Sequence, residues 1–160
     1  PKPEEPKPEE PKPELDGGVP NGATEIEPEI PWLERLPIEA NEANMKIGES
    51  EFRIHCSACH GHSGFGDGLV HRRAEALVQA TWVPPTSLHA IRIKEQPDGK
   101  IFNTITNGKG KMGGYGTNLS AQERWAIVLY VRALQRSRDA RIEDIPLEQR
   151  AQLEILGPNE

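Results

Sequence analysis

Residues 55–68 contain side chains whose types and spacing could form one reactive site. The stretch reads HCSACHGHSGFGDG and holds both cysteines of the 160-residue chain and three of its five histidines. Such groups occur in zinc sites, in dithiol redox pairs and where haem is covalently attached. Each chemistry requires different groups from the rest of the chain, so the remaining sequence distinguishes them.

The spacing of the two cysteines favours haem attachment. Cys56, Cys59 and His60 form the pattern C-x-x-C-H, the attachment signal for c-type haem. Thiols one helical turn apart are placed to add to the two vinyl groups on one side of a porphyrin. The imidazole that follows is then placed to bind the iron. We therefore predict one covalently bound haem c, held by both cysteines, with His60 as the proximal ligand of the iron.

Zinc and dithiol chemistry fit the sequence less well. A structural zinc site has four ligands, and the chain has no second cysteine pair, so zinc would have to recruit His62, His71 or His89. A thioredoxin-like dithiol belongs to a βαβ unit, and no such unit is visible in the sequence. Haem attachment is the interpretation that needs no further cysteine.

An electron carrier needs a second axial ligand for the iron, and Met112 is the best candidate. It lies in the glycine-rich stretch NGKGKMGGYG, where the glycines let the backbone approach a porphyrin closely. The other methionine, Met45, lies on the predicted helix that leads into the cysteines. Ligation by His and Met raises the reduction potential relative to more basic donors. Four histidines are weaker rivals because of their position or because their loops would have to rearrange: His55, His62, His71 and His89.

Groups outside the coordination shell are also expected to act on the site. The outer N–H of His60 needs an acceptor, and a backbone carbonyl of VPPTSL, residues 83–88, is the expected one. Trp82, Tyr115 and Asn118 are candidates for packing against the haem or for hydrogen bonds to its propionates. Each of the three is equally compatible with an ordinary core or loop position.

Three helices are expected to position these residues, and no alternating strands of useful length are visible. The first has Asn44 as its N-cap and leads into the cysteines. The second is N-capped near Asp98 and ends at Gly108. The third follows the capping box formed by Ser120 and Glu123 and is the clearest of the three. The sequence therefore predicts an all-α class with long loops.

The chain divides by composition into four parts. Residues 1–14 read PKPEEPKPEEPKPE, which favours a polyproline-II tether of about 40 Å or a tail without a specific partner. Residues 15–43 form an acidic, irregular linker. The haem domain is expected at 44–138 and a C-terminal extension at 139–160.

Both flanking parts contain apolar features. Trp32, Leu33 and Leu36 interrupt the polar linker, and docking on their own domain is favoured over docking on a partner. In the C-terminal extension a short helix is expected to begin at Pro146 and to end at Gly157.

Charge is distributed unevenly along the chain. The net charge of −6 combines −8 in residues 1–43, +6 in residues 44–138 and −4 in residues 139–160. A basic domain between acidic flanks is unlike a nucleic-acid-binding protein, whose basic surface is left free. No apolar run reaches the 18 or so residues that a membrane-spanning helix needs.

These motifs together resemble class I cytochromes c over residues 44–136. The similarity rests on CSACHGHSGFGDG, the Pro-Pro segment, the Met112 loop and the final helix with Tyr130. Gly48 and Phe52 match the G-x-x-x-F/Y pattern of that family's first helix. The resemblance implies an all-α fold of three to four short helices around one haem, with the first helix crossing the last nearly at right angles.

VPPTSLH, GKIFNTITNGKGKMGGYG and RWAIVLYVRALQRS more closely resemble the monohaem cytochrome c subunit of bacterial alternative complex III. This resemblance implies an electron-transfer protein, not an enzyme, in a quinol-oxidising respiratory or photosynthetic membrane complex. The implied partners are a multihaem cytochrome and a downstream carrier or oxidase. The implied location is the periplasmic face of the cytoplasmic membrane, peripheral or lipid-anchored. The chain begins at Pro1 without Met, which is compatible with an anchor or signal peptide upstream.

Other functions remain open at this point. The chain could be a free-standing periplasmic electron shuttle, the cytochrome c domain of a terminal oxidase, or a mainly structural subunit with haem as a relay. A haem peroxidase or gas-binding protein is less favoured, because it needs an open iron site and Met112 argues against one.

Overall fold

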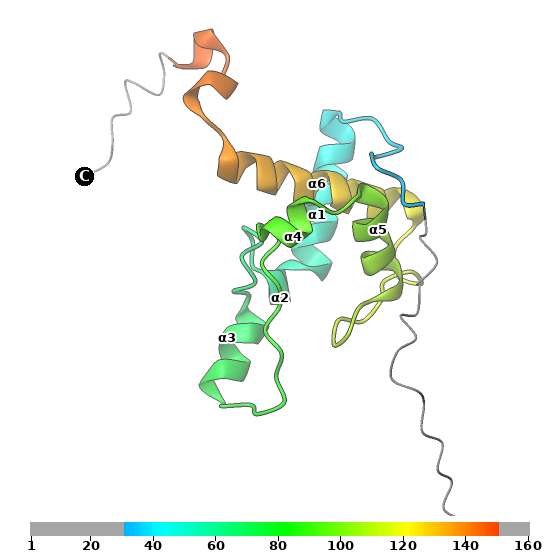
Figure 1. The fold of residues 1–160 in the computed structure, drawn as a ribbon, viewed down its shortest axis with the longest axis vertical. Helices are drawn as coiled ribbons and strands as arrows, with labels where there is room; N and C mark the ends of the chain where they lie inside the picture. Colours follow the sequence, from blue (N-terminus) through cyan, green and yellow to red (C-terminus); the bar gives the residue numbers. More distant parts are fainter. Residues whose placement is uncertain (1–30, 151–160) are drawn as a thin grey trace, which may run out of the picture. The chain divides into compact units, whose positions relative to one another are not determined.

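The computed structural model describes residues 31–150, and this part of the chain is helical without strands (Figure 1). Its β pairing consists of an isolated bridge between Lys109 and Met112. None of its helices combines the length and apolarity that crossing a membrane requires. The elements are α1 (Glu42–His55), α2 (Ser57–His60), α3 (Leu69–Ala76), α4 (Ile91–Lys94), α5 (Asp98–Asn107), α6 (Ala121–Asp139) and the 3-10 helix η1 (Ile142–Asp144).

The crossing of α1 and α6 is the centre of the fold, and Figure 1 shows α6 running across α1. Gly48 is buried at the crossing, where its missing side chain lets α1 approach the backbone of Ala126. One turn later the rings of Phe52 and Tyr130 pack with centroids 5.4 Å apart. The crossing that the class I cytochrome c resemblance implied is therefore present, with both of its aromatic residues in contact.

Side-chain caps fix the start of two helices. Asn41, not Asn44, is the N-cap of α1: its side chain accepts a hydrogen bond of 2.9 Å from the Asn44 backbone N–H. The predicted cap was three residues late because both positions are asparagine in a polar stretch. The capping box of Ser120 and Glu123 is confirmed at the start of α6. Caps of this kind contribute on the order of 1 kcal/mol each.

The start of α5 also differs from the prediction. Pro97 occupies the N-cap position, and Asp98 is the first residue of the helix rather than its cap. The carboxylate of Asp98 is buried and accepts a hydrogen bond from Arg132 at 2.6 Å. An ion pair with α6 has thus replaced the expected local cap. The predicted end of this helix at Gly108 is confirmed, with a left-handed φ of 79°.

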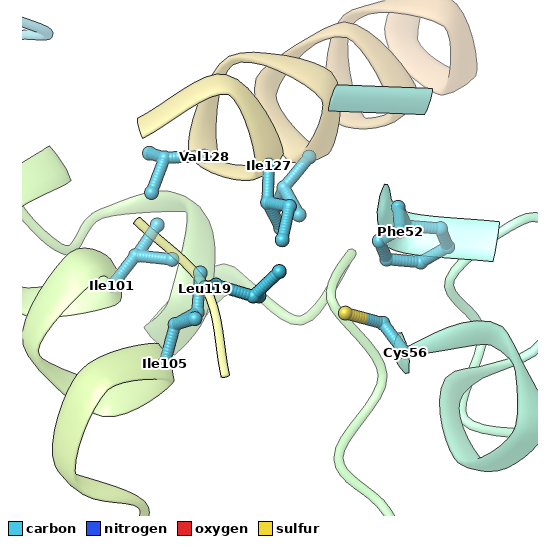
Figure 2. Packing of buried hydrophobic residues seen from close by; sticks show 8 residues of the cluster. Phe52, Cys56, Ile101, Ile105, Leu119, Ile127 and Val128 are labelled. Carbon is cyan, nitrogen blue, oxygen red and sulfur yellow. The ribbon is translucent and has the colours of Figure 1, made fainter. Parts of the chain in front are cut away.

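The core is a cluster of apolar side chains from α1, α5, α6 and the loop before α6. Figure 2 shows the sulfur of Cys56 directed toward the other side chains of this cluster. One attachment cysteine is therefore part of the packed core. The buried members are Phe52, Cys56, Ile101, Ile105, Leu119, Ile127, Val128 and Val131.

Two helices between α2 and α5 were not predicted. In α3, the sequence LVHRRAEA buries only Ala74, so it lacks the apolar periodicity by which helices are recognised. The other, α4, is a single four-residue turn.

The linker before α1 packs on the start of α5. The carbonyl of Leu33 accepts a hydrogen bond of 2.8 Å from Gly99 N–H, and Leu36 packs against the core. Leu33 itself remains 55% exposed. Docking of this segment on its own domain, the favoured prediction, is therefore seen for Leu36. The repeat at 1–14, the linker up to residue 30 and the predicted helix end at Gly157 lie outside the described residues.

Candidate cofactor site

The attachment cysteines lie at the junction of α1 and α2. Backbone hydrogen bonds continue through the motif, from Cys56 N–H to Phe52 O (2.9 Å) and from His60 N–H to Cys56 O (2.9 Å). The two thiols are consequently one helical turn apart, as the sequence predicts. Cys56 is buried, Cys59 is half-buried, and neither forms a disulfide.

The environment of Cys56 does not suit a dithiol redox pair. Burial, followed by the charges of Cys59 and Glu51, raises the pKa of Cys56 to about 12. A thiol of this kind stays protonated at neutral pH, whereas redox-active cysteines are thiolates. Within residues 31–150, no three His, Cys, Asp or Glu side chains converge as zinc ligands would.

A glycine-rich loop follows His60 and folds back on it. Gly66 N–H donates to the His60 carbonyl at 2.8 Å, and Gly66 has a left-handed φ of 85°. A Cβ on Gly66 would lie 2.4 Å from the Pro85 carbonyl oxygen, so glycine is also required by the close approach of that segment. The loop therefore brings residues 85–88 to the side of α2.

The side chain of His60 is half-buried, and its buried Nδ1 has no hydrogen-bond partner within residues 31–150. Burial lowers the pKa of His60, while the Thr86 backbone, acting as an acceptor, partly raises it. The two observations agree if the Thr86 carbonyl lies near the ring without being aligned with it. Thr86 belongs to the segment 83–88 in which the acceptor was predicted. A neutral imidazole is the form that binds a metal ion.

Met112 lies at the turn of a tight loop after α5. Lys109 N–H donates to the Met112 carbonyl (2.9 Å), and Met112 N–H donates back to Lys109 (3.0 Å). A Cβ on Gly108 would lie 2.4 Å from the Met112 carbonyl oxygen, which explains the glycine at this position. The Met112 side chain is half-buried.

Tyr115 connects the Met112 loop to the attachment cysteines. Its hydroxyl donates to the His55 carbonyl at 3.1 Å, and the two rings pack edge to face with centroids 5.6 Å apart. Its own N–H donates to the Ile105 carbonyl at 2.8 Å. Burial, with smaller contributions from Cys56 and Cys59, raises the pKa of Tyr115. Tyr115 was a candidate for haem contacts, and the structure assigns its hydroxyl to the backbone beside Cys56.

Trp82 was a candidate for contacts with the haem, but in the structure its indole binds His71. Its indole N–H donates to His71 Nδ1 at 2.9 Å, so that hydrogen bond is already made within the protein. Trp82 and Lys111 also line a cavity of ≈ 300 Å³ that borders the Met112 loop. Asn118 is exposed and accepts a hydrogen bond from Thr117.

Two of the rival ligands already have partners within the protein. His89 bonds through Nε2 to the Ser63 carbonyl at 2.7 Å, and His55 lies 3.4 Å from a Glu51 carboxylate oxygen. His62 is exposed, and Met45 is half-buried on α1. Among these four residues, His55 is the one linked to the Met112 loop, because its backbone carbonyl accepts the hydrogen bond from Tyr115.

The donor set fits a covalently attached haem. Two thiols stand one turn apart, a neutral imidazole follows directly, and a thioether lies on a loop hydrogen-bonded to the same turn. The buried Nδ1 of His60 leaves Nε2 as the nitrogen available for iron. The binding of iron by His60 and Met112 stays a prediction from the sequence.

One polar network beside α6 was missed. No role was predicted for Arg132, but its guanidinium binds Asp98 and the carbonyl groups of Lys94 and Gln96. An arginine within an apolar helix face was a signal for a buried partner.

Comparison with known proteins gives a family and two similar structures. The family described as cytochrome c oxidase, cbb3-type, subunit III matches residues 43–131. The reducing HAO-like protein complex of Kuenenia stuttgartiensis aligns over 62% of this chain with 23% identity and a TM-score of 0.51. Cytochrome CL from the marine methylotrophic bacterium Methylophaga aminisulfidivorans aligns over 69% of this chain with 25% identity and a TM-score of 0.43. No curated protein matches the sequence.

The chain spans 47% of the length of the Kuenenia chain and 66% of the length of Cytochrome CL. The likeness to the Kuenenia chain concerns the fold alone.

Proposed function

Because the chain belongs to the cytochrome c oxidase, cbb3-type, subunit III family, we propose that it transfers single electrons through one covalently bound haem c. Its fold is the all-α class I cytochrome c fold predicted from the sequence. The observation that carries the proposal is the hydrogen bond from Tyr115 to the His55 carbonyl. It ties the loop that carries Met112 to the turn that carries the cysteines.

Each site residue has a distinct role in this proposal. Cys56 and Cys59 would hold the porphyrin through thioether bonds, and His60 and Met112 would bind the iron. When bound, the haem iron supplies reversible one-electron oxidation and reduction. Because Cys56 belongs to the buried core, its thioether is fixed by the packing of α1, α5 and α6. The protein thus positions the redox group and turns over no substrate of its own.

We assign the chain to a membrane redox complex on the periplasmic side of the cytoplasmic membrane, held peripherally or by a lipid anchor. Resemblance of residues 83–89 and 99–116 to the alternative complex III subunit supports a quinol-oxidising complex. A multihaem cytochrome would then supply electrons, and a downstream carrier or oxidase would accept them. The family match supports a second candidate, a cytochrome c domain that serves a terminal oxidase.

Haem loading is the first test. The full chain, produced in a host that matures c-type cytochromes, should yield one haem per chain that denaturation and acidic acetone do not extract. Cys56→Ala with Cys59→Ala should abolish this retention. Extractable haem, or a stoichiometry other than one, would contradict the proposal.

Carbon monoxide tests the alternative functions that need an open iron site, a haem peroxidase or a gas-binding protein. A carrier with both axial positions occupied should resist carbon monoxide at neutral pH in the reduced state. Rapid, complete binding would instead indicate a peroxidase or a gas-binding protein.

The assignment to a complex is tested by affinity purification of the tagged chain from membranes. Recovery of a multihaem cytochrome with quinol oxidation supports the first candidate, and recovery of a copper-containing oxidase supports the second. A chain found alone in the periplasmic fraction would be a free shuttle.

A further inference from the structure

A buried polar network joins α6 to the segment before α5. Arg132 Nε donates to Asp98 Oδ1 at 2.6 Å, and Nη1 donates to the Lys94 carbonyl at 3.0 Å. Nη2 donates to the Gln96 carbonyl. Asp98 is only 7% exposed, so its charge depends on the arginine. The guanidinium is therefore held rigidly at one place beside α6.

Gln135 lies one turn further along α6 and is 5% exposed. Its Oε1 accepts a hydrogen bond from Arg132 Nη1 at 2.8 Å, and its Nε2 donates to the Leu88 carbonyl at 2.7 Å. Arginine offers donors only, so the amide oxygen must face Arg132. The amide nitrogen must consequently face Leu88. Arg132 thus fixes the orientation of the Gln135 side-chain amide.

Leu88 is held from both sides. Its carbonyl accepts from Gln135, and its N–H donates to the Gly64 carbonyl at 2.8 Å. The next residue, His89, bonds to the Ser63 carbonyl at 2.7 Å. The segment is therefore clamped between α6 and the loop that follows His60. The same segment reaches the loop after His60 at Pro85, whose carbonyl oxygen would lie 2.4 Å from a Cβ on Gly66, and Gly66 N–H donates to the His60 carbonyl at 2.8 Å. Thr86 follows Pro85 directly and lies two residues before Leu88, and the buried Nδ1 of His60 has no hydrogen-bond partner within residues 31–150.

We propose that Gln135, oriented by Arg132, is a positioning residue for the proximal imidazole: it holds Leu88, and through it the Thr86 carbonyl, beside Nδ1 of His60. The inference rests on the proposed function, because it takes His60 as an iron ligand. An acceptor at Nδ1–H makes the imidazole a stronger donor and stabilises ferric iron. Loss of the clamp therefore raises the reduction potential.

The variant Gln135→Glu tests the link to Leu88 selectively. Glutamate still accepts from Arg132, but it has no N–H for the Leu88 carbonyl. In the full-chain holoprotein we expect a higher reduction potential by spectroelectrochemistry. We also expect at least a tenfold faster solvent exchange of the His60 Nδ1 proton by NMR. Both axial ligands should remain bound.

Two further variants complete the test. Asp98→Asn weakens the support of Arg132 and should change potential and exchange in the same direction by a smaller amount. Arg124→Gln is the matched control, because Arg124 lies on α6 and bonds to Ser120 and Thr106, away from Leu88. It should lower stability without changing the potential or the exchange rate.

The outcomes separate this role from the proposed function. A Gln135→Glu holoprotein with wild-type potential and wild-type Nδ1 exchange would show that Gln135 only stabilises the fold, which overturns the inference. If Gln135→Glu does not fold, Asp98→Asn is used instead: a wild-type potential and wild-type Nδ1 exchange in that variant would likewise overturn the inference. A chain that never retains covalent haem would overturn the proposed function, and this role with it.

Discussion

A Cβ built on Gly48 would lie 2.0 Å from the carbonyl oxygen of Ala126. It would also lie 3.0 Å from the Cβ of Tyr130. The first contact is with backbone, which has no flexible end that could turn away. The crossing of α1 and α6 therefore depends on the absence of one side chain.

Gly48→Ala measures this dependence. Alanine favours an isolated helix by up to about 1 kcal/mol over glycine, whereas overpacking a core costs about 1–3 kcal/mol or more. Because the obstacle here is backbone, the steric term should dominate, and urea unfolding should show a net loss of stability. Gly48→Leu should not yield a stable fold.

The control for this prediction is Ser50→Ala, at an exposed position of the same helix. It should leave the free energy of unfolding nearly unchanged. A Gly48→Leu protein that loads haem and melts at the wild-type temperature would contradict the close crossing.

Tyr115→Phe removes the hydroxyl that binds the His55 carbonyl. A single hydrogen bond of this type contributes about 1 kcal/mol. Because this bond ties the Met112 loop to the cysteine turn, alkaline pH should detach the methionine from iron at a lower pH than in the wild type. An absorption titration of the ferric protein measures that midpoint.

Tyr130→Phe is a matched control, since the Tyr130 hydroxyl makes no hydrogen bond within residues 31–150. Its alkaline midpoint should equal that of the wild type. Equal midpoints for Tyr115→Phe and the wild type would show that the anchor has no effect on the loop.

The capping box of α6 predicts a dependence of stability on pH. The Glu123 carboxylate accepts from Ser120 N–H at 2.7 Å, and this bond, with that from the Ser120 side chain, lowers the pKa of Glu123 below its usual 4.5. A lowered native pKa adds stability above pH 4.5 that is lost as the pH falls through the native pKa. Glu123→Gln should lack this contribution.

Urea unfolding of both proteins from pH 6 downward checks the sign. The wild type should be more stable than Glu123→Gln near neutral pH, and the difference should vanish in acid. A difference that grows in acid would contradict the role of the carboxylate.

The sequence predicted those parts of the site that depend on local spacing. The turn that places Cys56, Cys59 and His60 is one helical period, and the Ser120 cap is a four-residue pattern. Both features depend on residues that are close in the sequence, so both can be predicted without a structure.

Contacts between residues that are far apart in the sequence were not predicted. Asp98 looked like an N-cap because aspartate favours that position, but a buried arginine from α6 binds it instead. The partner of Trp82 is His71 on α3, a helix without an apolar stripe. No prediction was made for Gln135, because its partners Arg132 and Leu88 meet it only in the folded domain. These roles arise only when separate segments meet.

The central claim is that His60 and Met112 both bind the iron of one covalent haem. The most direct measurement is the far-red absorption band that a thioether bound to ferric haem iron produces, recorded on the full-chain protein. We predict that the band is present in the wild type and lost in Met112→Ala, which should also bind carbon monoxide when reduced. A wild type without the band, or a Met112→Ala spectrum identical to it, would contradict the account.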